Sequence, residues 1–89
     1  MERDFSFTFA DAVTFEQIEQ AVTRLRLNEL RTFGPVEIFR GGNVSTGKYS
    51  ILLRAVFQSS QQTLREDEVA RWSGQIVKAL AGLGGALRG

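Results

Sequence analysis

Two stretches of this chain alternate apolar and polar residues, and that alternation limits the fold more than any other feature. Residues 4–9 read DFSFTF, with phenylalanine at every second position. Residues 48–58 read KYSILLRAVFQ, and a period of two places one apolar set on one face. That set is Tyr49, Ile51, Leu53, Ala55 and Phe57. The other face of this stretch also carries Leu52 and Val56, which favours a central strand. We expect these two strands to form the centre of a sheet.

Two further stretches have helical periodicity. Thr14 and Gln17 have the spacing of a capping box, and an apolar stripe follows it, so the first helix should run from about residue 15 to residues 28–29. Its stripe is Phe15, Ile18, Val22 and Leu25. Thr63 and Glu66 predict a second capping box, followed by a stripe of Val69, Trp72, Ile76, Leu80 and Leu83. Trp72 lies on this stripe and is therefore assigned to the core. Glycines at 82, 84 and 85 should end the helix.

The remaining segments complete a β-α-β-β-α-β order. Residues 30–40 form a strand interrupted by Gly34-Pro35, which indicates an edge position or a bulge because proline cannot donate to a ladder. Residues 86–88 form a short last strand. This order predicts an α+β, ferredoxin-like βαββαβ fold: a four-stranded antiparallel sheet of order 4-1-3-2 with two helices on one face. The predicted core is Phe5, Phe7, Phe9, Ile18, Val22, Leu25, Ile51, Leu53, Phe57, Trp72, Ile76 and Leu80.

Composition narrows the function classes. Residues 1–89 suffice for one small domain, with 43% hydrophobic residues and neither cysteine nor histidine. The most frequent general base and the usual zinc ligands are therefore absent, and the acids at 66–68 are explained by the start of a helix. No catalytic set is visible, so we expect no enzyme activity, metal or cofactor in this chain alone. No apolar run spans a membrane and MERD is not a signal peptide, so we expect a cytoplasmic protein with no membrane partner.

The stretch GGNVSTGKYS, residues 41–50, resembles a nucleotide-binding P-loop by spacing alone. A P-loop leads into a helix whose N-terminus holds phosphate, and a Ser or Thr after the lysine binds Mg²⁺. Here Lys48 leads into alternating β residues, and Tyr49 follows it. We therefore interpret the stretch as a turn in which Gly41, Gly42, Asn43 and Gly47 supply positive-φ positions.

The basic residues concentrate in the middle of the chain. Residues 20–57 carry six basic and two acidic side chains, a net charge of +4, which favours a polyanionic partner. Near the glycine-bearing turn, Arg40, Lys48 and Arg54 are candidate phosphate contacts, and Phe39 and Tyr49 are candidate stacking residues. Arg54 has an equally good interpretation as a solvated charge on the sheet. Packing is an equally good interpretation for both aromatic rings.

Four motifs, in order and correctly spaced, resemble one family. They are RDFSF at residues 3–7, VEIFRG at 36–41, GKYSILLRAVF at 47–57 and TLREDEV at 63–69. Over residues 3–88 the chain resembles the C-terminal ferredoxin-fold anticodon-binding domain of the bacterial phenylalanyl-tRNA synthetase β subunit. Gly47, Lys48, Ser50 and Arg54 match one family motif. Phe39, Glu37, Tyr49 and Arg65 depart from the usual Tyr, Asp, Lys and Thr.

The resemblance implies a role in RNA binding. It implies that the chain is a fragment of a phenylalanine–tRNA ligase, an aminoacyl-tRNA synthetase of protein biosynthesis. Its partners would be the anticodon arm of tRNA(Phe), the rest of the β subunit and the α subunit. ATP and Mg²⁺ would serve the parent enzyme elsewhere. The RNA-binding residues are expected to be Arg40, Lys48, Arg54, Phe39, Tyr49 and Ser50. The alternative is a ferredoxin-like protein–protein interaction module without RNA binding.

Overall fold

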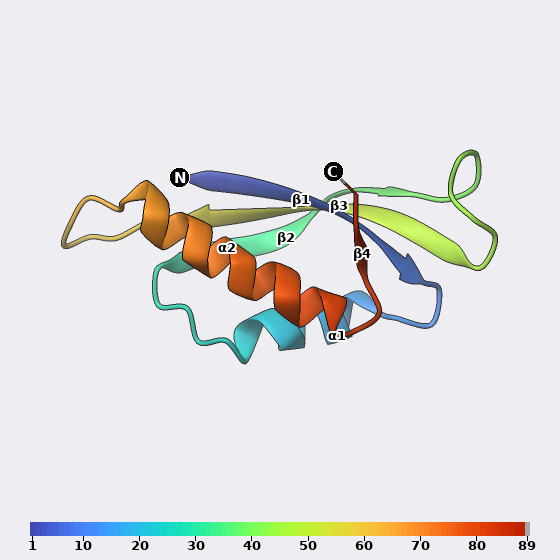
Figure 1. Cartoon of the computed structure of the whole chain (residues 1–89), viewed down its shortest axis with the longest axis horizontal. Coiled ribbons are helices and arrows are strands. Elements are labelled where there is room, and N and C mark those ends of the chain that lie inside the picture. The colour runs from blue at the N-terminus through green and yellow to red at the C-terminus, as the bar shows by residue number, and fades with distance from the viewer. Residues whose placement is uncertain (89) are drawn as a thin grey trace.

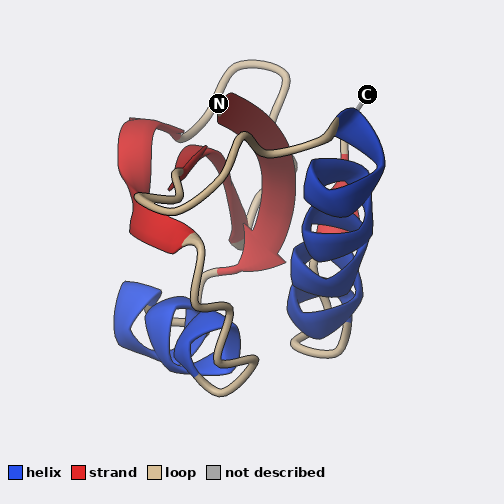
Figure 2. Cartoon of the chain, turned by 90° about the vertical axis from the view of Figure 1, so that its left-hand side faces the viewer, coloured by secondary structure: helices blue, strands red, loops and turns tan. Residues whose placement is uncertain are grey.

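A computed structural model describes residues 1–88 and contains the predicted order of elements. Gly89, which the expected domain range includes, lies outside the described residues. The elements are β1 (Glu2–Ala10), α1 (Phe15–Thr23), β2 (Leu30–Phe39), β3 (Lys48–Phe57), α2 (Glu66–Ala81) and β4 (Ala86–Leu87), labelled in Figure 1. The helices gather on one side of a twisted sheet (Figure 2), which confirms the ferredoxin-like α+β prediction.

The sheet is antiparallel with strand order β2-β3-β1-β4, so β1 and β3 are the central pair as predicted. Their register places Phe5 opposite Leu53 and Phe7 opposite Ile51. Apolar residues therefore face apolar residues across the ladder on one side of the sheet. Cross-strand pairs of this kind stabilise a sheet and resist a shift of register.

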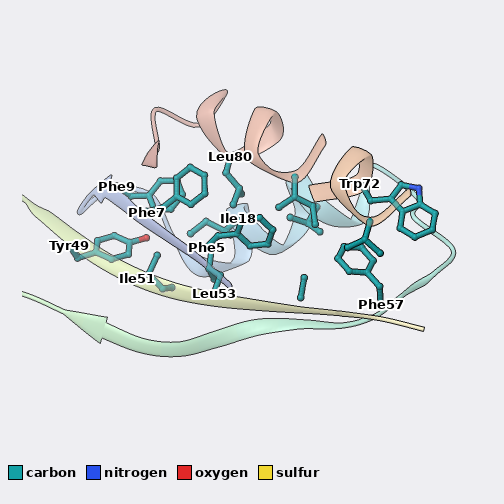
Figure 3. Packing of buried hydrophobic residues seen from close by; sticks show 14 residues of the cluster. Phe5, Phe7, Phe9, Ile18, Tyr49, Ile51, Leu53, Phe57, Trp72 and Leu80 are labelled. Carbon is teal, nitrogen blue, oxygen red and sulfur yellow. The ribbon is translucent and has the colours of Figure 1, made fainter. Parts of the chain in front are cut away.

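The core lies between this sheet face and the helices, as Figure 3 shows for its labelled residues. Eleven of the twelve predicted core residues are buried. Trp72 is among them, with its ring centroid 5.6 Å from that of Phe57, so it is a packing residue and not a stacking platform. The exception is Leu25, which is half-buried and packs against the edge of the core.

The first helix is shorter than predicted. It ends at Thr23, with Arg24 as C-cap, and Arg26 has a left-handed backbone with φ 53°. Leu25 and Leu27 both pack against the core although they are two residues apart, a spacing that no helix places on one face. The left-handed residue between them turns the chain so that both leucines point inward. The helical spacing of Leu25 is compatible with both a further helical turn and this left-handed turn, so the sequence pattern did not show where the helix ends.

The second helix begins later than predicted, because Arg65 and not Thr63 is its N-cap. The Glu68 carboxylate accepts a hydrogen bond from the Arg65 backbone N–H at 3.1 Å. Leu64 and Val69 have the spacing of a hydrophobic staple: Val69 belongs to the core cluster, and Leu64 is partly buried and packs against it. This apolar pair fixes where the chain enters the helix, and it leaves Thr63 outside.

Two predictions for the β2–β3 hairpin are confirmed: the edge position or bulge of β2, and a turn in place of a P-loop at residues 41–47. β2 is an edge strand, and its register with β3 shifts between Pro35 and Glu37, where proline interrupts the ladder. The following loop leads directly into β3 at Lys48, so no helix N-terminus is present to form a P-loop. Gly41, Gly42 and Gly47 have positive φ values of 74°, 57° and 84°, whereas the expected fourth position, Asn43, does not.

The first capping box gives a direct test of helix stability. Gln17 N–H donates to Thr14 Oγ1 at 3.2 Å, and Thr14 N–H donates to Gln17 Oε1 at 2.9 Å. Thr14→Ala should lower the free energy of unfolding by about 1 kcal/mol, measured by urea denaturation, because the Gln17 N–H loses the hydroxyl that accepts its hydrogen bond. Thr63→Ala is the matched control and should change it by less than about 0.5 kcal/mol. Equal costs would show that the N-cap assignment of α2 is wrong.

Candidate nucleic-acid interface

The sheet face away from the helices is open, and the strand register determines which side chains lie in one row across the strands. Phe39 of β2 and Thr8 of β1 both pair with Ser50 of β3, which makes one row next to the 40–47 loop. Two residues further along β3, Leu52 is opposite Ser6 and Glu37, and then Arg54 is opposite Asp4 and Gly34. Of the predicted site residues on this face, Phe39 and Ser50 therefore lie side by side, whereas Arg54 lies four residues further along β3.

Phe39 is an aromatic residue available at this surface. It is the last residue of β2, its side chain is 50% exposed, and its register places it on the open face. It borders a hollow of about 570 Å³ that is lined by residues 38–44 and Arg88. An exposed ring beside a hollow has room for an unpaired nucleobase on its face.

Tyr49, the other stacking candidate, belongs to the core. It is 4% exposed, its hydroxyl donates to the Val13 carbonyl oxygen at 2.6 Å, and its ring lies 6.0 Å from that of Phe9. Burial raises the pKa of the Tyr49 hydroxyl above its usual value. Of the two interpretations, packing therefore holds, and the ring is not available for stacking. Tyr49 instead supports Arg40, whose guanidinium carbon lies 4.9 Å from the Tyr49 ring centroid.

Ser50 is covered by Arg88, which is not among the predicted site residues. Its side chain is 1% exposed, its hydroxyl lies 3.1 Å from Thr8 Oγ1, and it accepts a hydrogen bond from Arg88 Nη1 at 2.8 Å. Arg88 N–H also donates to the Ser6 carbonyl oxygen, which ties the end of the chain to β1. Arg88, and not Ser50, thus presents a polar group at this surface. Extending the alternation of the last strand from Ala86 to Arg88 would have placed Arg88 on the open face.

The three predicted basic residues differ in their surroundings. Arg40 is exposed and its Nη1 lies 2.7 Å from Asp11 Oδ1. Lys48 is exposed at the start of β3, and within residues 1–88 it forms no ion pair. Both flank the glycine-bearing loop, which projects from one end of the sheet (Figure 1). Arg40, Lys48, Phe39 and Arg88 therefore gather around this loop.

Arg54 lies apart from that group, and its charge is largely compensated. It donates two hydrogen bonds to the Asp4 carboxylate, at 2.9 and 3.1 Å, and lies 3.4 Å from Glu2. The hydrogen bond to Arg54 holds the pKa of Asp4 below its usual value. Arg54 is also four residues along β3 from Ser50, about 13 Å at the usual rise per residue. It is a weaker candidate for a phosphate contact than Arg40 or Lys48.

The structure offers little for other kinds of site. In the part of the chain that is described, no group of three acidic side chains is placed to hold a metal ion. Over the same residues, no helix has the length and apolar character needed to cross a membrane. The candidate nucleic-acid interface is the loop end of the open sheet face, where Phe39, Arg40 and Arg88 line one hollow.

Comparison with known proteins gives the family. A model of the ferredoxin-fold anticodon binding domain matches residues 1–88. The phenylalanine–tRNA ligase β subunits of Geobacter sulfurreducens and Ruegeria pomeroyi are 31% and 30% identical to this chain, over 97% and 100% of its length. That of Streptococcus agalactiae is 25% identical over 90% of the chain. The chain spans only 10–11% of these relatives. It belongs to the ferredoxin-fold anticodon-binding domain family.

Proposed function

We propose that this domain binds the anticodon arm of tRNA(Phe) and helps to position it on a phenylalanine–tRNA ligase. The ligation itself, with its ATP and Mg²⁺, takes place in other parts of that enzyme, and this domain needs no cofactor. The rest of the β subunit and the α subunit are its protein partners. The observation that carries the proposal is the half-exposed Phe39 ring, which lies beside a hollow bordered by Arg40 and Arg88.

The geometry suggests how the RNA is held. Single-stranded loop bases are recognised by stacking on aromatic rings, and Phe39 supplies such a ring at the end of an open sheet. Arg40 and Lys48 lie beside it and can contact phosphates, which position RNA without reading its sequence. The central strands present no aromatic residue on the open face: the alternating positions are Ser6 and Thr8 on β1 and Leu52 on β3. Stacking therefore takes place at the loop end and not at the sheet centre.

A titration with a short RNA hairpin that carries the tRNA(Phe) anticodon loop tests this function. We expect weak binding, with Kd of about 10⁻⁴ to 10⁻⁶ M, and a log–log plot of affinity against salt with a negative slope. In NMR spectra of the labelled domain, amides of residues 38–44 and 48–50 should shift most. Shifts centred on α2 would refute the assigned surface. The absence of any shift at millimolar RNA would refute RNA binding by this domain.

The second candidate is a protein-interaction module that does not bind RNA. Leu52 and Val56 favour it, because they are apolar residues on the open face and only partly covered. A surface that contacts only protein would give no salt-dependent RNA binding, so the same titration separates the two functions.

A further inference from the structure

A second hollow lies far from the loop end, between α1 and the first half of β2. It has a volume of about 520 Å³ and is lined by the last turn of α1, residues 26–28 and residues 30–33. The apolar side chains that line it are Val22, Leu27, Leu30 and Phe33. We call it the α1–β2 groove. In Figure 1 the connection from α1 to β2 lies at the opposite end of the molecule from the loop between β2 and β3.

The rim of this groove is basic. Arg26 and Arg31 both line it and both are exposed, whereas Glu19 is the single carboxylate among its described lining residues. Neither arginine forms an ion pair within residues 1–88. By contrast, Arg3, Arg40 and Arg54 each lie within 3 Å of a carboxylate oxygen. The arginines of the groove are therefore available to a carboxylate from another molecule.

The backbone places these arginines at the surface. The left-handed conformation of Arg26 turns its neighbours Leu25 and Leu27 toward the core and leaves the Arg26 side chain outside. Arg31 falls where the β2–β3 register shifts between Leu30 and Thr32, so it is the extra residue of a bulge. The groove also runs beside an unpaired sheet edge, because within the described residues β2 pairs only with β3.

We propose that the α1–β2 groove binds an extended acidic segment of a protein partner. The segment pairs with the outer edge of β2 as an added strand, places apolar side chains over Val22, Leu27 and Phe33, and sets carboxylates against Arg26 and Arg31. Strand addition of this kind takes its affinity from main-chain hydrogen bonds and its specificity from pockets for alternate side chains. This site does not depend on the proposed RNA surface, which lies at the other end of β2.

The chemistry of the groove favours a peptide over RNA. A phosphate backbone uses the two arginines but gains nothing from an apolar floor or from a free strand edge. An acidic peptide uses all three features at once. The same surface contacted by RNA is a distinct outcome that the test below includes.

A labelled peptide of alternating valine and glutamate is the probe, and fluorescence anisotropy measures its binding to the full chain. We expect saturable binding, with NMR shifts at residues 22–33. Replacing Arg26 by asparagine, which tolerates the left-handed conformation, together with Arg31→Gln should weaken binding about fivefold or more through the loss of two ion pairs. Arg71→Gln with Lys78→Gln removes two charges from exposed positions of α2 and is the matched control, with no change expected.

Further probes separate strand addition from simple charge attraction. Two peptides, one N-methylated at its valines and the other at its glutamates, block donation from opposite edges, so at most one of them should bind, and a valine–lysine peptide should not bind. Unchanged affinity of both N-methylated peptides would overturn strand addition. Shifts at residues 22–33 caused by the RNA hairpin and not by the acidic peptide would overturn the choice of partner. Neither result tests the proposed role of Phe39 and Arg40, which lie at the other end of β2.

Discussion

Phe7→Ala is expected to remove a large part of the stability of this domain. Phe7 is fully buried in the middle of β1, is paired with Ile51, and its ring centroid lies 5.6 Å from that of Phe9. Truncating a buried phenylalanine to alanine costs about 3–5 kcal/mol, because apolar contacts are lost and a cavity remains. Small domains have a total stability of only about 5–15 kcal/mol.

Urea denaturation followed by circular dichroism measures this loss. Phe39→Ala makes the same chemical change at a half-exposed position and is the control, with an expected loss below about 1 kcal/mol. A variant at Phe7 that is as stable as the one at Phe39 would show that the sheet does not pack against the helices in this way.

The second large effect is on RNA affinity. Removing the Phe39 ring and neutralising its basic neighbours, as Phe39→Ala with Arg40→Gln and Lys48→Gln, should take hairpin binding below detection. Stacking of one base on an aromatic ring is worth about 1–3 kcal/mol. In the single variants Arg40→Gln and Lys48→Gln, which should still bind, each lost phosphate contact should make the salt slope less negative by about 0.7–0.9. Anisotropy titrations at several salt concentrations measure both quantities.

The matched control for this triple variant uses Val36, Arg71 and Lys78. Val36 is an exposed apolar residue of β2, 42% exposed, that does not line the hollow beside Phe39. Val36→Ala with Arg71→Gln and Lys78→Gln should therefore bind the hairpin like the unaltered domain. Equal losses in the two triple variants would mean that RNA does not bind at the loop end of the open face. Arg54 is tested separately, as Arg54→Gln. A replacement by glutamate is unsuitable, because Asp4 and Glu2 would repel the carboxylate that it introduces.

Local sequence patterns determined most of the fold. The alternation of Phe5, Phe7 and Phe9 defines β1 and its buried face, because a period of two has one geometric meaning in a strand. Pro35 indicated that β2 lies at an edge or carries a bulge, since proline cannot donate a ladder hydrogen bond, and the structure shows both features. Thr14 and Gln17 marked the start of α1 correctly, because a capping box involves only neighbouring residues.

The candidate site depended on contacts between distant segments, which no local pattern encodes. Tyr49 was assigned to a face correctly, but its burial follows from Val13 and Phe9, which lie 36 and 40 residues earlier in the chain. The pairing of Arg54 with Asp4 exists only because register places β1 and β3 side by side with those residues opposite each other. For the same reason, the basic residues of the segment 20–57 lie on two separate surfaces. Arg40 and Lys48 lie at one end of β2, and Arg26 and Arg31 lie at the other end.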